Sequence, residues 1–492
     1  MDFLDPKKKK AHRIRLYIGY FLMAIALSIG TLILLFEVSG YDYDRKTGTV
    51  IQNGLVFVNS HPEQSQIYVN GKLEGQTDTR LTLPSGHYDV ELRRDGYRNW
   101  KRSLDLEGSK VERLNYAFMF PEKLEPADVQ LYANQPKLVM QSPDRRWLWV
   151  QQPGSLGNFD LYDLNSDNDT NATLSIPSTL FTEVAGDHKV EMVEWSTDNR
   201  HVLVKHTYTG GSEFLMLDRE QPTQSLNINK TFNIPMSEVV LRDKKFDQLH
   251  ILDSNGGVLR FADAKSKNVT LIASRVVAFK SYSDDVILYA TEEAAPAGRV
   301  VVNVRRGNDV YKLRELPKSP KVLVDLARFD DRWYMAVGTD VESKAYIYEN
   351  PFDDIARQNP RIPAPIAVLR VKQLEHLSFS ANTRFAGVQG GSEFATYDAE
   401  HGRTYRFDTG LKLDPGQEAF WMDGHRYSLV SENQVTVFDF DGSNQQKLTT
   451  ANPTLRPFFD RDYDNMYNIG TSAAVKDKPA LLKTPVRTSS DK

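Results

Sequence analysis

Residues 195–204 read Trp-Ser-Thr-Asp-Asn-Arg-His-Val-Leu-Val and set the pattern for most of this chain. A turn that holds Asp or Asn leads into an apolar strand, and a second apolar strand ending in Asp follows at residues 214–218. Apolar, β-branched runs bounded by Asp, Asn and Ser are typical of strands joined by tight turns. The stretch therefore predicts a pair of neighbouring β-strands.

The same pattern returns along the chain. Clear copies lie at residues 142–150, 379–388 and 421–430, and weaker copies begin near Asp243, Ser283, Phe329 and Phe459. Partner strands ending in Asp follow the clear copies at residues 159–163, 394–398 and 435–439. The copies are spaced by roughly 40 to 54 residues, the period expected when one blade of a β-propeller contains about four strands.

One pentapeptide occurs twice without change. Gly-Gly-Ser-Glu-Phe stands at residues 210–214 and again at residues 390–394, each time at the hairpin between the two strands of a copy. Chance repetition at matching positions is improbable, so the pentapeptide indicates internal duplication.

The Trp-Ser-x-Asp turn before an apolar strand resembles the blades of TolB-type and prolyl-oligopeptidase-type propellers over residues 129–486. The copies predict about eight blades, with seven as the alternative. The last blade is incomplete, and Ala480-Leu481-Leu482 together with a strand at residues 129–132 would close it. Closure hides sheet edges, which are the main aggregation hazard of a large β-protein. Residues 487–492 are predicted to be a disordered tail.

At the other end, residues 16–36 form a run of 21 residues without a charge or a proline. As a helix this run would span about 31 Å, close to the ~30 Å hydrocarbon layer of a bilayer. Residues 1–15 hold six Lys and Arg against two Asp, and Glu37, Asp42 and Asp44 follow the run. Basic flanks stay in the cytoplasm, so we expect one transmembrane helix with residues 1–15 inside. A cleaved signal peptide, with small residues at 38–40, is the alternative.

Between the helix and the repeats, short β-rich runs alternate with turn residues. Residues 37–54 are predicted to be a stalk, 55–117 a small β-sandwich and 118–128 a linker. The hairpin signal Asn70-Gly71 follows the run at residues 67–69. Further turns are indicated at residues 84–86 and at Asp95-Gly96.

This order of strands and turns resembles the PEGA domain. The resemblance rests on residues 60–63, 67–71, 75–77, 83–88 and 96–97, and it covers about residues 55–114. The chain departs from the family at residues 63–65, where Glu-Gln-Ser stands for Glu-Gly-Ala, and at Thr77-Asp78, where the family has Thr-Pro. The resemblance implies a sandwich found in bacterial and archaeal envelope proteins and often suggested to bind surface polymers. Tyr97 and Trp100 are candidate sugar-stacking residues, with closure of the sandwich core as the alternative.

Bulk composition excludes some functions. The net charge is −4 although the first 15 residues are basic, so the rest of the chain is acidic, which argues against the clustered basic face of a nucleic-acid-binding protein. The chain has no cysteine, which removes disulfides, thiol catalysis and cysteine metal sites.

Motifs for catalysis are missing. The sequence contains no Gly-x-Ser-x-Gly and no His-Glu-x-x-His, and no cofactor is expected. Two acidic loops, at residues 163–169 and 460–464, space carboxylates as calcium loops do, but both lack the glycine and glutamate of such loops. Solvated turns between strands are the alternative.

These observations favour an all-β, membrane-anchored envelope protein without catalytic activity, which binds an envelope protein or a cell-wall polymer outside the cytoplasm. Two alternatives remain. One is an enzyme, a hydrolase or lyase with acidic or His side chains converging on the propeller's central opening. The other is a signalling receptor, which the tail of about 15 residues makes less attractive because it holds no effector domain.

Overall fold

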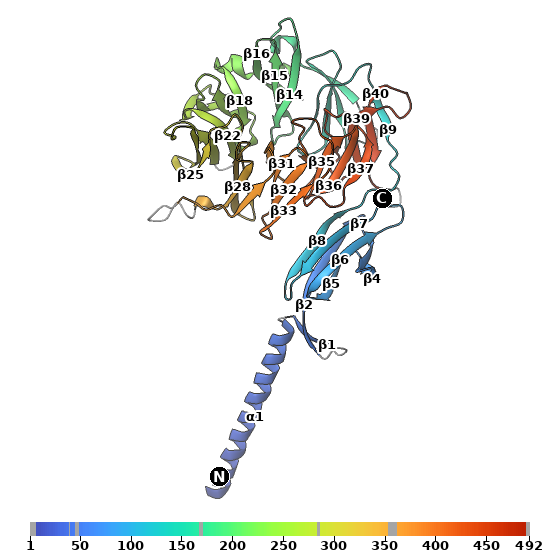
Figure 1. Ribbon diagram of the computed structural model, residues 1–492, viewed down its shortest axis with the longest axis vertical. Helices are drawn as coiled ribbons and strands as arrows, with labels where there is room; N and C mark the ends of the chain where they lie inside the picture. Colours follow the sequence, from blue (N-terminus) through green and yellow to red (C-terminus); the bar gives the residue numbers. More distant parts are fainter. Residues whose placement is uncertain are drawn as a thin grey trace, which may run out of the picture. The chain divides into compact units, whose positions relative to one another are not determined.

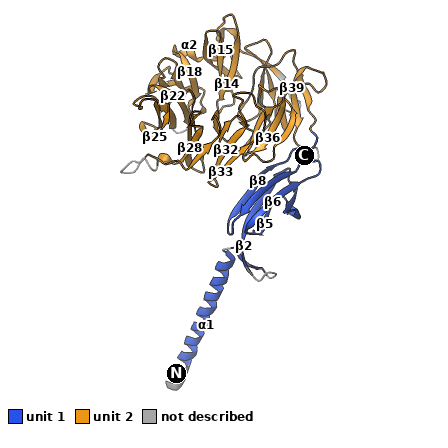
Figure 2. Cartoon of the chain, viewed as in Figure 1, with its two compact units in different colours: residues 1–123, 488–492 blue, residues 124–487 orange. Residues whose placement is uncertain are grey.

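The computed structural model describes residues 6–38, 40–44, 49–166, 171–282, 286–352 and 362–488. The chain divides into two compact units, residues 1–123 with 488–492 and residues 124–487 (Figure 2). The first unit holds a helix and a small sandwich, and the second consists mainly of β-strands. The predicted blade start at Ser283 and most of the predicted disordered tail lie outside the described residues.

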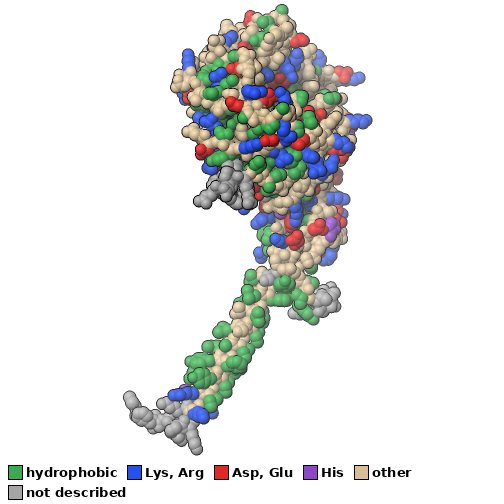
Figure 3. All heavy atoms as spheres, turned by 60° about the vertical axis from the view of Figure 1, so that its left-hand side comes forward, with side chains coloured by type: hydrophobic (Ala, Val, Ile, Leu, Met, Phe, Trp, Pro, Cys, Tyr) green, Lys and Arg blue, Asp and Glu red, His purple; other side chains and the backbone are tan. Residues whose placement is uncertain are grey.

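The first unit begins with helix α1 (Pro6–Val38), which contains the predicted span. Within it, residues 12–38 are long and apolar enough to cross a membrane, and the most apolar part of this segment has no buried residue. Figure 3 shows its apolar side chains exposed along the helix, with basic side chains towards one end. A long helix with apolar side chains on all sides is typical of a membrane span or a signal sequence.

A sandwich of two four-stranded sheets follows α1 (Figure 1). The first sheet contains β1 (Tyr41–Asp44), β2 (Thr49–His61), β5 (Thr79–Pro84) and β8 (Val111–Phe118), and the second contains β3 (Gln66–Val69), β4 (Lys72–Gln76), β6 (Gly86–Arg93) and β7 (Trp100–Leu106). β2 pairs antiparallel with β5 and parallel with β8. The residues Val56, Ile67 and Leu92 are fully buried in its core.

Part of the predicted stalk is paired in the structure. β1 forms an antiparallel ladder with the first residues of β2, from Tyr41 opposite Gln52 to Asp44 opposite Thr49. The polar composition of this segment predicted no strand, because every second residue of Tyr41-Asp42-Tyr43-Asp44 is charged. Alternation of that kind suits a strand with one solvated face.

The second unit contains eight four-stranded antiparallel sheets among its described residues. Blade 1 contains β10 (Val139–Gln141), β11 (Trp147–Gln151), β12 (Asn158–Asp163) and β13 (Asn171–Ser175), and blade 2 contains β14 (His188–Trp195), β15 (His201–Tyr208), β16 (Gly211–Asp218) and β17 (Leu226–Asn227). Blade 3 contains β18 (Met236–Leu241), β19 (Gln248–Asp253), β20 (Leu259–Asp263) and β21 (Val269–Ala273), and blade 4 contains β22 (Val276–Tyr282), β23 (Val286–Thr291), β24 (Arg299–Arg306) and β25 (Asp309–Pro317).

Blade 5 contains β26 (Val322–Phe329), β27 (Arg332–Thr339), β28 (Lys344–Glu349) and β29 (Ala367–Arg370), and blade 6 contains β30 (His376–Phe379), β31 (Phe385–Gly390), β32 (Glu393–Asp398) and β33 (Arg403–Asp408). Blade 7 contains β34 (Phe420–Trp421), β35 (Arg426–Ser431), β36 (Gln434–Asp439) and β37 (Gln446–Thr450), and blade 8 contains β38 (Phe458–Phe459), β39 (Asn465–Thr471), β40 (Pro479–Pro485) and β9 (Ala127–Leu131). Short helical turns stand at α2 (Ile228–Phe232), η1 (Ser178–Leu180), η2 (Pro222–Gln224) and η3 (Arg242–Lys244).

The last blade combines both ends of the propeller. β40 pairs antiparallel with β9, which places Ala480 opposite Leu131 and Leu481 opposite Gln130. This is the closure that the apolar runs at residues 129–132 and 480–482 predicted. An apolar cluster then joins blade 8 to blade 1, through Tyr467 and Leu481 on one side and Leu148 and Tyr162 on the other.

Apolar clusters also join successive blades around the ring. Blades 1 and 2 share Trp149, Phe159 and Trp195, and the two indole rings meet edge to face at 5.4 Å. Similar clusters join blades 2 and 3, 3 and 4, 4 and 5, 5 and 6, and 6 and 7. Between blades 7 and 8, the side-chain amide of Asn468 donates to the carbonyl oxygen of Thr450 at 2.8 Å. The second unit is therefore a closed eight-bladed propeller.

The strand order gives this propeller two distinct faces. The first strands of several successive blades lie against one another and surround the axis. We call the face with the loops between first and second strands and between third and fourth strands the turn face, and the opposite one the hairpin face. The repeated Trp-Ser-x-Asp turns lie on the turn face, and both copies of the pentapeptide lie on the hairpin face.

Candidate functional site

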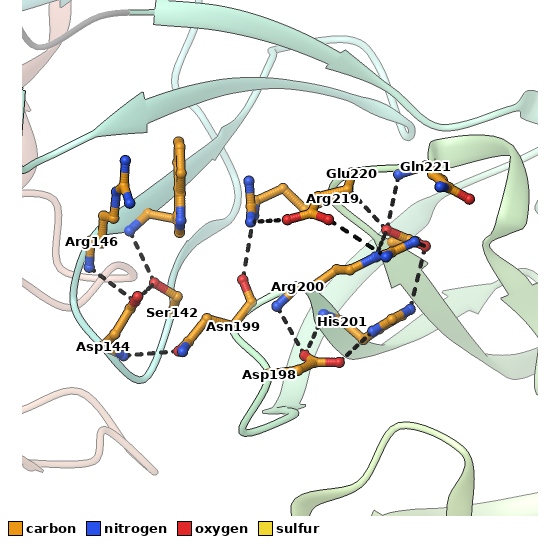
Figure 4. Close-up of polar contacts among 12 residues, drawn as sticks. Ser142, Asp144, Arg146, Asp198, Asn199, Arg200, His201, Arg219, Glu220 and Gln221 are labelled. Carbon is orange, nitrogen blue, oxygen red and sulfur yellow. Dashed lines mark hydrogen bonds and ion pairs between the residues drawn. The ribbon is translucent and has the colours of Figure 1, made fainter.

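The repeated turns of the turn face are built around an Asp or Asn side chain. In blade 2, Asp198 accepts hydrogen bonds from the backbone N–H groups of Arg200 at 2.9 Å and His201 at 3.0 Å, and its other oxygen lies 2.7 Å from His201 Nδ1 (Figure 4). In blade 1, Asp144 accepts from the Ser142 hydroxyl and from the Arg146 N–H. These carboxylates satisfy backbone donors in a tight turn, which explains why the sequence repeats Asp or Asn there.

An arginine at the end of each clear turn binds the Asp that ends the third strand of the same blade. The pairs are Arg146–Asp163, Arg200–Asp218, Arg384–Asp398 and Arg426–Asp439. In blade 6 the pair is bidentate, at 2.9 and 2.6 Å, and only 7% and 1% of the two side chains are exposed. The recurring Asp at the end of the partner strand is therefore a structural element of the blade.

The blade 6 pair makes stability depend on pH. Burial alone would raise the pKa of Asp398, but hydrogen bonds from His401 and Arg384 outweigh it and lower that pKa to about 2. An unfolded Asp has a pKa of about 3.9, so this group stabilises the fold above pH ~4 and loses its contribution as the pH falls towards 2. We expect the difference in unfolding free energy between the wild type and Asp398→Asn, measured by urea unfolding, to shrink by about 2–3 kcal/mol over that range. A difference independent of pH would contradict the assignment.

Neighbouring turns are also tied to each other. The backbone N–H of Asp144 donates to Asn199 Oδ1 at 3.0 Å, so the turn of blade 1 contacts the turn of blade 2 (Figure 4). Arg219 donates to the carbonyl oxygen of Asn199 at 3.3 Å, and its guanidinium lies 4.2 Å from the ring centre of Trp147. The turn carboxylates and amides are thus engaged by the protein itself, which leaves them little capacity for a ligand.

The glutamates of the duplicated pentapeptide have matching roles on the hairpin face. Glu213 accepts from the backbone N–H and hydroxyl of Thr182, both at 2.7 Å, and from Asn227 at 2.7 Å. Glu393 accepts from the Lys372 N–H at 3.1 Å, and Lys372 lowers its pKa to about 2 by hydrogen bonding. Each glutamate fixes the segment that enters its blade, so the pentapeptide serves the architecture.

Charged side chains from successive first strands gather near the propeller axis. Lys280 on β22 lies 4.0 Å from Asp325 on β26, and this carboxylate, followed by those of Glu194 and Glu238 among others, raises the pKa of Lys280. Burial raises the pKa of Glu238 on β18. Glu194 is engaged by the Leu241 N–H and the Lys244 ammonium. The axis therefore brings together acidic side chains from three blades, a convergence that one sequence could not show.

A second cluster lies where blades 7, 8 and 1 meet. A cavity of about 210 Å³ is lined there by Gln141, Ser142, Pro143, Arg145, Phe420, Trp421, Met422, Ser428, Arg456, Pro457, Phe458 and Phe459. Arg145 belongs to the blade 1 turn, and Arg456 precedes β38. No sequence motif marked this cavity, because its walls come from segments about 280 residues apart in the chain.

The two sequence-predicted binding residues lie inside the sandwich. Tyr97 is 2% exposed and Trp100 is fully buried, and the Trp100 indole meets Tyr116 of the opposite sheet edge to face at 5.7 Å. The Tyr97 hydroxyl accepts the backbone N–H of Thr488 at 2.8 Å. A ring without an exposed face has none to offer a sugar, so both positions fit the core alternative and give the binding role no support.

The carboxylates of the two acidic loops contact the protein. Asp163 is bound by Arg146, and Asp460 accepts from the Asp464 N–H at 2.8 Å and the Asn465 side chain at 2.8 Å. Asp167 and Asp169 lie outside the described residues. Within the described part of the chain, no group of three His, Asp or Glu side chains is placed to hold a metal ion.

The sandwich has a known counterpart. Residues 53–120 match the PEGA domain. At one departure from the family, Gln64 takes the place of a glycine with φ of +56°, in the left-handed region that glycine adopts most easily. At Asn70-Gly71 the φ angles of +49° and +79° suit the tight hairpin predicted between β3 and β4.

Solved structures similar to the chain include β-propeller proteins. Kluyveromyces lactis Hsv2p is 12% identical, with 65% of this chain and 100% of that chain covered at a TM-score of 0.41. The β-propeller domain of Cps50 (Swd1), from a Myceliophthora thermophila source, is 13% identical, with coverages of 66% and 100% and a TM-score of 0.39. The dihydro-heme d1 dehydrogenase NirN is 16% identical, with coverages of 67% and 67% and a TM-score of 0.38. No curated protein matches the chain.

Proposed function

We propose that this protein is a non-catalytic binding platform, held at a membrane by α1 with the PEGA domain and the propeller outside the cytoplasm. The main support for the proposal is that the propeller uses its repeated polar side chains to stabilise its own blades. The turn carboxylates, the Arg–Asp pairs and the pentapeptide glutamates are engaged by the propeller itself. The repeats therefore build a rigid ring, and binding is left to the surfaces that this ring displays.

The membrane anchor is supported by composition and exposure together. The apolar segment of α1 has no buried residue, and Lys10, Arg13 and Arg15 precede or begin it. Burying such a helix in lipid removes a large apolar area from water, whereas the described residues of the first unit leave most of it exposed. The excess of basic residues supports a cytoplasmic location for this end.

A bacterial envelope is the setting we propose, with an envelope protein as the partner of the propeller. The PEGA domain would serve as a spacer or as a contact to a wall polymer. The absence of cysteine in a chain of 492 residues suits an exported protein that depends on core burial instead of disulfides.

An enzyme acting at the propeller axis is the second candidate. The observation in its favour is the convergence of Glu194, Glu238 and Asp325 around Lys280. Two of these carboxylates are engaged, Glu194 by Leu241 and Lys244 and Asp325 by the N–H groups of Leu326 and Phe379. A general acid or base must be free to reach a substrate proton, so only Glu238 suits that role.

Crosslinking in intact cells tests partner binding. A full chain with a C-terminal tag is compared with a tagged chain that ends at residue 128 and so lacks the propeller. We expect a defined protein to be captured by the full chain alone. Capture of the same material by both chains, or of wall polymer alone, would contradict the platform role of the propeller.

A further inference from the structure

The cavity between blades 7, 8 and 1 is lined by two arginines that have no carboxylate partner among the described residues. Among the described residues, the guanidinium of Arg456 has no hydrogen bond or ion pair, and it lies over the rings of Phe420 and Phe458, at 5.0 and 4.8 Å from their centres. Burial lowers the pKa of this arginine. A partly desolvated cation without an acceptor is unfavourable unless something supplies one.

Arg145 adds a second cation to the same cavity. Its Nη2 donates to the carbonyl oxygen of Met422 at 2.9 Å, and its guanidinium lies 4.2 Å from the ring centre of Tyr463. These contacts hold the side chain in place, yet its Nη1 is buried without a hydrogen-bond partner in the described part of the chain. Elsewhere in the propeller, Arg146, Arg200, Arg384 and Arg426 each face an Asp of their own blade.

The lining of the cavity indicates what it would accept. Its lining residues include two arginines, several aromatic rings and no acidic residue. The nearest acidic influence on Arg456 comes from Glu418, which does not line the cavity. Planar guanidinium groups bind carboxylates through two parallel hydrogen bonds, and flat aromatic walls suit a planar group.

The size of the cavity selects among carboxylate-bearing ligands. Pockets that enclose a whole small molecule usually measure about 300–1,000 Å³, whereas this one measures about 210 Å³. It is large enough for one residue-sized group and too small for a complete cofactor. A single acidic residue, presented by a longer partner that covers the surrounding surface, matches this volume.

We propose that Arg145 and Arg456 form an anion-binding pocket that receives one carboxylate of a peptide segment from the protein partner. The inference rests on the proposed function, because it names the chemistry by which that partner is recognised. The carboxylate is either an Asp or Glu side chain or a free C-terminus, and both sources would meet the same two guanidinium groups.

Calorimetric titration of the detergent-solubilised full chain with three N-acetylated peptides tests the pocket. The probes are amidated Gly-Gly-Asp-Gly-Gly, pentaglycine with a free C-terminus, and amidated pentaglycine as the neutral control. We expect binding of at least one carboxylate peptide and none of the neutral one, and the better binder of the two identifies the source. Equal heats from all three peptides, or no binding of either carboxylate peptide at 10 mM, would overturn the proposal.

Substitutions assign the binding to the two arginines. We expect Arg456→Gln and Arg145→Gln each to lower the binding affinity for the better carboxylate peptide at least about tenfold, equivalent to ~1.4 kcal/mol. Arg370→Gln, which removes an exposed arginine from the outer strand β29, should leave the affinity unchanged. Arg456→Lys keeps the charge without the planar fork and should give an intermediate loss if Arg456→Gln does not fold. Unchanged affinity in a folded Arg456 variant would overturn the proposal, as would tighter binding of the same peptide carrying phosphoserine in place of Asp.

The pocket and the platform role can fail separately. If the crosslinked partner is captured equally by the wild type and Arg456→Gln, the pocket is not its docking point although the platform role stands. If the peptides bind as expected while no protein is captured, the pocket stands and the proposed function fails.

Discussion

Replacing Arg384 by Ala should lower the free energy of unfolding of the propeller by about 3–5 kcal/mol, the cost of removing one partner from a buried ion pair. Asp398, which is 1% exposed, would lose two charge-assisted hydrogen bonds at 2.9 and 2.6 Å. The same substitution removes the stacking of the guanidinium on Phe385. Urea unfolding followed by tryptophan fluorescence measures the loss.

Arg332→Ala is the matched control for this prediction. Arg332 pairs with Glu349 in blade 5, but 55% and 27% of these two side chains are exposed. Water and salt screen such a pair, which limits its contribution to about 0–1 kcal/mol. Equal losses for the two variants would show that burial does not decide the strength of these pairs, and the Arg–Asp motif would then lose its role as a structural element of the blade.

Ending the chain at Lys478 should abolish the closed propeller, since this truncation removes β40. Both β39 and β9 lose their partner strand, and the buried side chains of Leu481 and Leu482 are lost with it. Each buried leucine contributes about 1.5–3 kcal/mol, and the two open edges become templates for aggregation. We expect aggregation in size-exclusion chromatography and rapid digestion by a protease.

A chain that ends at Thr488 keeps β40 and serves as the control. It should elute and resist protease as the full chain does. If the chain ending at Lys478 behaves in the same way, closure by β9 and β40 is not what holds the ring together.

The propeller could be predicted from the sequence because blades 1, 2, 6 and 7 share the same turn and the same Asp at the end of the third strand. In blade 2, Asp198 holds the turn and Asp218 forms the ion pair with the arginine. In blade 6, Asn382 holds the turn and Asp398 forms the ion pair. The closing strand could also be predicted, since the apolar run at residues 480–482 had no neighbouring strand of its own in the repeat pattern.

Sites formed by residues from distant segments could not be predicted from the sequence. Arg145 and Arg456 are separated by most of the propeller and follow no motif, and only the closed ring brings them to one cavity. Lys280 and Asp325 stand on different blades in the same way. For Trp100, the sequence left stacking and core packing open, because an aromatic residue at the start of a strand fits either until the opposite sheet is placed.

The side of the membrane on which the propeller lies is the most direct test of an anchored platform, and the absence of native cysteine makes the measurement clean. Val341, which is 63% exposed in blade 5, and Lys10, at the start of α1, are each replaced by Cys in separate chains. Intact cells are treated with a membrane-impermeant maleimide before and after lysis. We expect Val341→Cys to be labelled in intact cells and Lys10→Cys only after lysis. Labelling of Lys10→Cys alone in intact cells, or protection of both, would contradict an anchored propeller outside the cytoplasm.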